Sequence, residues 1–375
     1  RTTIMITIRL HYFFLILVLS GSLACCSPNE PVKIGFMGGV SGRVADLGIA
    51  GRNGALLAVE MCNQAGGVNG RTVELLVEDD QQNADQARLA VQRLIDQKVE
   101  AIVGPMTSMV AMSAVPLVNQ AQVVMVSPTV STQELSHSDD YFFRVISSTA
   151  EYAHKSADYH ASQQGIRRVA VAYDMRNEAY SESWLKAYRK GFAAHGGEVV
   201  LAEYYYSGDD VNFAALAEKL LRVKPDAVLV IANSLDTAML AQQVRKRDQH
   251  VHIATSEWAA TERLSELGGS AVEGMMIAQF MDRESNNPNY LAFRQAYIDR
   301  FSMEPGFGGV TAFDAMNVVL TALAGKDKNQ TLKQAILSKG TFIGVQSEIL
   351  FDKMGDAKRE TYMTTIHNGH FLRVR

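Results

Sequence analysis

The sequence has few cysteines and little net charge. Its 375 residues include only Cys25, Cys26 and Cys62, and three thiols cannot form a disulfide framework. The fold must therefore rest on hydrophobic cores, for which a hydrophobic content of 47% is ample. A formal net charge of −4 gives no basic field, which argues against a nucleic-acid partner.

Motifs for nucleotide binding and hydrolysis are also missing. Residues 38–42 are rich in glycine but lack dinucleotide-binding spacing, and neither a phosphate-binding loop nor a Gly-x-Ser-x-Gly nucleophile elbow occurs. His250 and His252 share a strand face, and His367 and His370 flank a turn. Neither pair brings the further ligands that zinc requires. The sequence therefore predicts no catalytic residue, no metal and no cofactor.

The first 24 residues resemble an export signal. Arg9 supplies positive charge, residues 12–19 form a short apolar run, and small residues lead to Ala24. The apolar run is too short to span a membrane. We therefore expect a signal peptide over residues 1–24 and a periplasmic or other extracytoplasmic location.

The cysteine after Ala24 indicates a lipid anchor. A small residue precedes Cys25, as in a bacterial lipoprotein cleavage box, so we expect lipid on Cys25 and a tether over residues 25–31. Two alternatives stay open: lipid on Cys26, or an ordinary signal peptide with incidental cysteines. The anchor is the only membrane contact that we expect.

The segment on either side of Gly66 holds a pattern that repeats along the chain. Leu56, Val59 and Cys62 recur at spacings of three, which is typical of one helix face. Gly66 permits a helix stop, and residues 73–77 are typical of a buried strand. The first half has predicted strands at 32–37, 72–78, 100–103 and 122–126, and predicted helices at 48–65, 83–97 and 108–120.

The same alternation begins again after residue 167. Predicted strands lie at 168–173, 198–205, 227–231, 252–255 and 275–279, with predicted helices at 181–195, 211–221 and 235–247, then at 288–301 and 309–323. Strands follow residue 340, with a hairpin turn at Asn368 and Gly369. This alternation predicts an α/β fold of two Rossmann-like lobes with parallel sheets flanked by helices.

Glycines and polar residues, together with Val68, Pro128 and Phe143, stand at many of the expected strand and helix ends. They are Ser41, Gly42, Asn53, Gly54, Glu60, Asn63, Gly66, Gly67, Val68, Gly70, Arg71, Asp79, Asp80, Gly104, Ser127, Pro128, Phe143 and Arg144. From about Val32 to the C-terminus the chain resembles the type I periplasmic binding proteins, in particular the leucine/isoleucine/valine-binding receptors of ABC transporters.

The resemblance implies a three-crossing hinge between the lobes, with ligand bound in the cleft. The expected crossings lie near 146–149, 279–282 and 340–347, and the expected lobes are 32–147 plus 280–343 and 148–279 plus 344–375. It also implies an ABC importer receptor for a small amino acid or related carboxylate, with an ABC permease as partner. The alternative is a sensor of the same fold for an amide or small organic acid.

Ligand-binding residues are expected where strands end at the cleft. Helix N-termini there offer N–H groups and partial positive charge to a ligand carboxylate. By resemblance, Ser108 and Ser131 provide hydroxyls and Val130 a backbone carbonyl. Ser108 is also a plausible helix cap, and the 127–132 loop is also a plausible plain turn.

The second lobe contributes an acid and a tyrosine. By resemblance, Glu257 pairs with a ligand ammonium and Tyr180 reaches across the cleft. The alternative roles are a helix-start acid for Glu257 and packing for Tyr180. Asn233 stands where relatives often place a tyrosine.

Two further positions depart from the pattern. Leu47 stands where a tryptophan often covers the ligand, and Thr149 where many relatives carry an ammonium-binding aspartate. The predicted ammonium site therefore depends on Glu257, helped by neutral oxygens. Aliphatic or aromatic acids and amides stay open as ligands.

Overall fold

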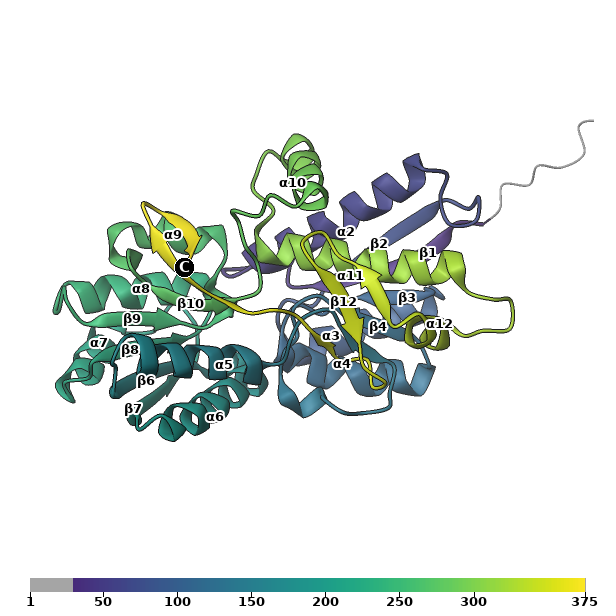
Figure 1. Cartoon of the computed structure of the whole chain (residues 1–375). Helices are drawn as coiled ribbons and strands as arrows, with labels where there is room; N and C mark the ends of the chain where they lie inside the picture. Colours follow the sequence, from purple (N-terminus) through teal and green to yellow (C-terminus); the bar gives the residue numbers. More distant parts are fainter. Residues whose placement is uncertain (1–29, 375) are drawn as a thin grey trace, which may run out of the picture.

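The protein has two α/β lobes that lie side by side, as the computed structural model in Figure 1 shows. The structure describes residues 30–374, so the predicted signal peptide and Cys25 lie outside it. The predicted fold class is confirmed: each lobe has a sheet made largely of parallel strands, and helices flank both sheets.

The first lobe is built on a five-stranded parallel sheet in the order β2-β1-β3-β4-β5. The strands are β1 (Val32–Gly38), β2 (Val73–Asp79), β3 (Ala101–Val103), β4 (Val124–Ser127) and β5 (Phe142–Arg144). The helices are α2 (Asp46–Gln64), α3 (Ala84–Asp96) and α4 (Ser108–Ala121). β1, β3 and β4 are almost wholly buried, as expected of strands covered on both faces.

The second lobe has a seven-stranded sheet in the order β15-β14-β10-β9-β8-β6-β7. Its strands are β6 (Arg168–Asp174), β7 (Glu198–Tyr205), β8 (Ala227–Ile231), β9 (His252–Thr255), β10 (Met276–Gln279), β14 (Tyr362–His367) and β15 (His370–Arg373). Its helices are α5 (Thr149–Asp158), α6 (Glu178–Ala194), α7 (Phe213–Arg222), α8 (Ser234–Arg245) and α9 (Glu262–Gly268). β14 and β15 form the antiparallel edge, joined by the predicted turn at Asn368 and Gly369.

After β10 the chain returns to the first lobe. There it forms α10 (Pro288–Phe301), α11 (Gly306–Gly325) and α12 (Leu332–Lys339). α11 is long and apolar enough to cross a membrane, but 83% of its most apolar window is buried, so it serves as a core helix. Its backbone touches α2: a Cβ on Gly54 would stand 2.1 Å from the carbonyl oxygen of Gly309.

The third crossing lies later than the sequence predicted. A small antiparallel sheet of β11 (Thr341–Ile343), β12 (Glu348–Phe351) and β13 (Ala357–Lys358) stays beside the first lobe (Figure 1). Phe351 packs on Phe143 of β5, and Asp356 pairs with Arg144 at 2.7 Å. The chain therefore crosses after β13 and not at 340–347. We propose lobe boundaries at 30–146 plus 281–358 and 147–280 plus 359–374.

Two helices of the second lobe, α5 and α9, were not predicted. α5 follows the first crossing directly and packs against α6. Its buried residues, Tyr152, Ala153, Ser156 and Ala157, recur at helical spacing. Small and polar residues dominate this face, so the hydrophobic period of the helix is weak in the sequence.

Candidate functional site

A pocket lies between the lobes, at the carboxyl ends of both sets of parallel strands. This is where open α/β sheets usually bind ligands. The deeper part, which we name the inner pocket, is lined by Leu47, Met106, Thr107, Ser108, Thr129, Ile146, Tyr152, Asn177, Tyr180, Glu257, Trp258, Gln279, Phe280 and Phe307. Its free space is only about 20 Å³, so a ligand can enter only as the lobes part or side chains turn.

Glu257 is the one acidic residue of the inner pocket. It follows β9 and is buried, with Oε2 accepting a hydrogen bond from Trp184 Nε1 at 2.9 Å. Its other oxygen, Oε1, has no hydrogen-bond partner within residues 30–374. Burial raises the pKa of Glu257 to about 7, opposed by hydrogen bonds from its own backbone and Trp184 and by the nearby Tyr180 hydroxyl. A ligand cation at Oε1 would restore the charge that burial disfavours.

Two tyrosine hydroxyls belong to the same pocket. Tyr180 on α6 and Tyr152 on α5 are buried, and neither hydroxyl has a well-formed hydrogen bond within the described chain. Burial, then the nearby Glu257 carboxylate, holds the pKa of each tyrosine above its ordinary value, so both remain protonated donors. Buried polar groups are normally paired, so these atoms mark a place for a polar ligand.

Aromatic and aliphatic side chains form the rest of the wall. Trp258 meets the Tyr180 ring edge to face, with centroids 5.5 Å apart. Phe280, Phe307 and Leu47 add apolar surface. The inner pocket thus offers one carboxylate, two hydroxyls and an apolar surround.

The first-lobe side of the pocket is the start of α4. The helix begins at Ser108, with Thr107 at the N-cap and no side-chain cap, so the predicted capping role of Ser108 is wrong. The Ser108 hydroxyl lines the pocket and accepts a hydrogen bond from Thr132 N at 3.3 Å. The next amide, Met109 N, donates to Asn177 Oδ1 of the second lobe at 2.9 Å.

Three residues predicted from the resemblance do not line the pocket. Val130 is fully buried in the first-lobe core, and its N–H donates to Ser127 Oγ at 3.0 Å. The Ser131 carbonyl accepts from Thr149 N at 2.7 Å, and Thr149 Oγ1 lies 2.7 Å from Ser183 Oγ. Ser131 and Thr149 therefore join the lobes to each other beside the pocket; Thr129 is the lining residue of this loop.

Leu47 and Asn233 lie where expected, but in different parts of the cleft. Leu47 lines the inner pocket. Asn233 faces the outer part of the cleft, where its Oδ1 caps α8 by accepting from Asp236 N at 2.9 Å. The sequence predicted Ser108, Tyr180, Glu257 and Leu47 as site residues. It missed Tyr152, because the helix that carries this residue, α5, was not predicted.

The outer cleft is a polar space of about 350 Å³, and ion pairs cross it. Arg43 of the first lobe bonds the buried Asp236 of the second at 2.6 Å and lies 3.1 Å from Asp209. Asp46 accepts hydrogen bonds from Ser234 at 2.7 Å and Thr261 at 2.6 Å. These contacts, which we name the cleft latch, hold the lobes together at the mouth of the pocket.

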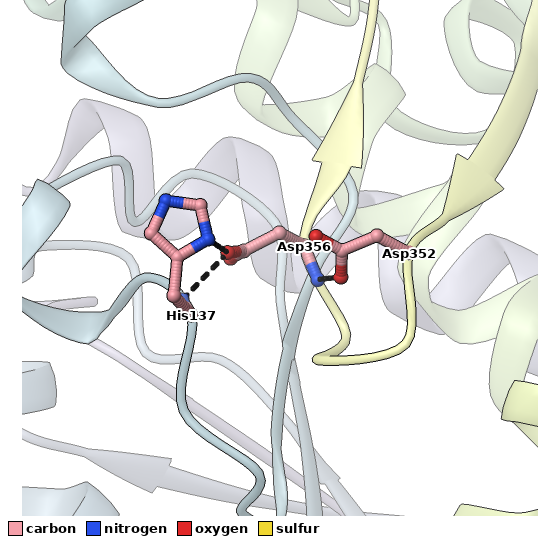
Figure 2. Close-up of side chains that lie close together, drawn as sticks. All are labelled: His137, Asp352 and Asp356. Carbon is pink, nitrogen blue, oxygen red and sulfur yellow. Dashed lines mark hydrogen bonds and ion pairs between the residues drawn. The ribbon is translucent and has the colours of Figure 1, made fainter.

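His137, Asp352 and Asp356 form a separate cluster near β13 (Figure 2). Their ligand atoms lie within 4.8 Å of one another, but Asp356 already pairs with the buried Arg144. Asp356 also accepts from His137 N, and Asp352 accepts from the Asp356 backbone at 2.9 Å. The cluster therefore fastens the β12–β13 turn to the first lobe.

Fold and site together define a two-lobed binding protein whose ligand pocket lies at the hinge. A family model described as periplasmic binding protein matches residues 31–370. The chain therefore belongs to the periplasmic binding protein family, a family of binding proteins and not of enzymes.

The individual relatives have low sequence identity to this chain. The chain is 25% identical to the leucine-, isoleucine-, valine-, threonine-, and alanine-binding protein of Pseudomonas aeruginosa, over 97% of this chain and 96% of that one. A branched-chain amino acid transporter substrate-binding protein from Streptococcus pneumoniae, solved with isoleucine, has a TM-score of 0.84 at 24% identity, covering 92% of this chain and 99% of that one. A solute-binding protein from R. palustris, solved with benzoate, has a TM-score of 0.83 at 18% identity, with 92% and 95% covered. At these identities the structures support the fold alone.

Proposed function

We propose that this protein is the solute receptor of an ABC importer and holds a small ligand with an amine or amide head group in the inner pocket. The named relatives support the transport role, since they are amino acid or solute receptors. The proposed ligand belongs to the size class of small amino acids and related compounds. The comparisons give no support to the sensor alternative, and we propose no catalytic role.

The observation that carries this proposal is the unpaired oxygen of Glu257. A buried carboxylate with a free acceptor costs stability unless a ligand pairs with it. Tyr152 and Tyr180 add two donors to the same pocket, and the aromatic walls favour an organic ligand over an inorganic ion. The inner pocket thus holds an acceptor and two donors that lack partners, and a bound ligand would supply the partners when the lobes close.

The first experiment is native mass spectrometry of the purified protein, which should detect a carried small molecule. A thermal-shift screen of amino acids, amides and amines should then give stabilising ligands, since a ligand bound only by the folded state raises Tm. Glu257→Gln should remove the shift for the best amine, while Glu266→Gln, an exposed acid on α9, should keep it. If no compound is carried and none raises Tm, the solute class is wrong.

We also propose an extracytoplasmic location with a lipid anchor at Cys25, as the signal-like start predicts. Because Cys25 lies outside residues 30–374, the support is its place after Ala24. Metabolic labelling with palmitate tests it: Cys25→Ser should abolish labelling and Cys26→Ser should keep it. The reverse result would move the anchor to Cys26.

A further inference from the structure

The side chain of Asn177 bonds a different helix from the one that it precedes. It stands at the N-cap of α6, where asparagine usually accepts a hydrogen bond from its own helix. Here it makes no such bond, and its Oδ1 accepts from Met109 N on α4 at 2.9 Å. Because Asn177 belongs to the second lobe and Met109 to the first, this bond forms only when the lobes are close.

The amide that donates to Asn177, Met109 N, lies in the first turn of α4, where a helix favours a bound anion. The start of a helix such as α4, which has 14 residues, carries partial positive charge and unpaired N–H groups. A ligand carboxylate placed there in the closed form would meet Asn177 Oδ1, a second acceptor, in competition for Met109 N. Leaving one buried acceptor unpaired costs about 1–3 kcal/mol, or about 5–150-fold in affinity.

No cation compensates for this on the pocket wall. Within residues 30–374, the lining side chains include one acid, Glu257, and no Lys, Arg or His. Arg359 lies 5.2 Å from the Phe280 ring centroid and pairs through Nη2 with the buried Asp314; its Nε and Nη1 have no partner within residues 30–374, but the residue does not line the pocket. A carboxylate would therefore enter a pocket whose only formal charge is negative.

The opposite end of the pocket offers hydrogen-bond acceptors to a ligand that carries an N–H donor. Glu257, Tyr180 and Tyr152 line this part of the pocket, are 7%, 4% and 0% exposed, and each has a side-chain oxygen without a partner within residues 30–374. An ammonium or amide N–H can pair with Glu257 Oε1, and the faces of Trp258 and Phe280 can stabilise a cation beside it. The Glu257 end of the pocket therefore suits an ammonium or amide N–H, whereas the α4 end is unfavourable for a carboxylate.

Resting on the solute-receptor function above, we propose that the inner pocket selects small amines and amides that carry no carboxylate. Asn177 is the residue that disfavours the carboxylate, because in the closed form its Oδ1 takes Met109 N, one of the amides at the α4 N-terminus. The specificity of this receptor therefore depends on a residue that need not touch the selected ligand.

The test compares three ligands that differ only at the carboxylate: valine, valinamide and 2-methylpropylamine. Their small side chain suits the narrow pocket. Titration calorimetry of the wild-type protein, freed of carried ligand, should give valinamide and the amine at least about fivefold tighter binding than valine, the lower limit of the cost above.

Variants at position 177 should move this ratio in opposite ways. Asn177→Ala frees Met109 N but also removes a bond that favours closure, a loss that all ligands share, so the ratio of valine affinity to amine affinity should rise at least about fivefold. Asn177→Asp keeps an acceptor in place and adds negative charge, so valine should stay excluded. Asn212→Ala is the matched control: Asn212 caps α7 on the surface, accepting from Ala215 N at 3.0 Å.

Each outcome decides the question. Wild-type protein that binds valine as tightly as valinamide overturns the selection but leaves the solute-receptor function standing. Failure of both valinamide and the amine to bind also overturns it; the receptor function falls only if no carried solute and no stabilising compound is found. An unchanged ratio among the three ligands in Asn177→Ala, with all affinities moved together, shows an effect on closure alone and overturns the role of Asn177.

Discussion

Replacing Glu257 by glutamine should stabilise the ligand-free protein at high pH while weakening its binding site. Burial raises the pKa of Glu257 from 4.5 to about 7, so the folded protein prefers the protonated acid. The sign follows: this preference is fully present below pH 4.5 and is lost as the pH rises to about 7. Above that, ionised Glu257 destabilises the fold.

The magnitude comes from the pKa difference. Each pKa unit corresponds to about 1.4 kcal/mol, so a rise from 4.5 to about 7 costs about 3 kcal/mol at pH 8.5. This is an upper value, because opening of the lobes hydrates the carboxylate. Glutamine resembles the protonated acid and can still accept from Trp184, so Glu257→Gln should recover up to this amount at pH 8.5 and almost nothing at pH 4.5.

Urea unfolding followed by circular dichroism, with ligand removed, measures the difference between variant and wild type at the two pH values. Glu266→Gln, at an exposed position, should show no pH-dependent difference. The same Glu257→Gln protein should bind an amine about 10–150-fold more weakly, the range for a charged hydrogen bond. A variant equally destabilised at both pH values would show that Glu257 is not a strained acid, and would refute the reasoning.

Three further changes test the cleft and the fold. Arg43→Ala leaves the buried Asp236 unpaired in the closed form, so ligand affinity should fall by about 1–3 kcal/mol and small-angle scattering should show a larger radius of gyration; the surface change Arg88→Ala should do neither. Tyr152→Phe removes an unpaired buried hydroxyl, so urea unfolding should show equal or higher stability while calorimetry shows weaker ligand binding. Gly54→Ala places a Cβ against the Gly309 carbonyl and should cost about 1–3 kcal/mol in urea unfolding, whereas Gly325→Ala, with open space around it, should be nearly neutral.

Local patterns were sufficient for most of the architecture. The glycine stops and buried runs of the first lobe predicted β1 to β4 and their helices, because strands covered on both faces have a strong apolar signal. The third crossing was misplaced because β11–β13 are short and half exposed, and what holds them is Phe351 on Phe143 and Asp356 on Arg144. Such long-range partners leave no periodic trace.

The site was predictable where it follows strand ends and hidden where it depends on cross-lobe partners. Ser108, Tyr180 and Glu257 come soon after strands and line the pocket. Val130 does not, since within one loop Thr129 turns to the pocket and Val130 to the core. Asn177 was not predicted as a site residue, because no local pattern shows that its side chain bonds another helix.

The closed form is a balance of opposing terms within one cleft. The Arg43–Asp236 pair and the Asp46 hydrogen bonds favour closure without any ligand, each with a worth of about 1–3 kcal/mol. Ionised Glu257 opposes closure by up to about 3 kcal/mol at pH 8.5, the same penalty as above. A ligand cation that cancels this penalty raises the closed-to-open ratio by up to about 150-fold at that pH. The cleft latch therefore sets the closed-to-open ratio of the empty protein, and the charge of the ligand shifts that ratio toward the closed form.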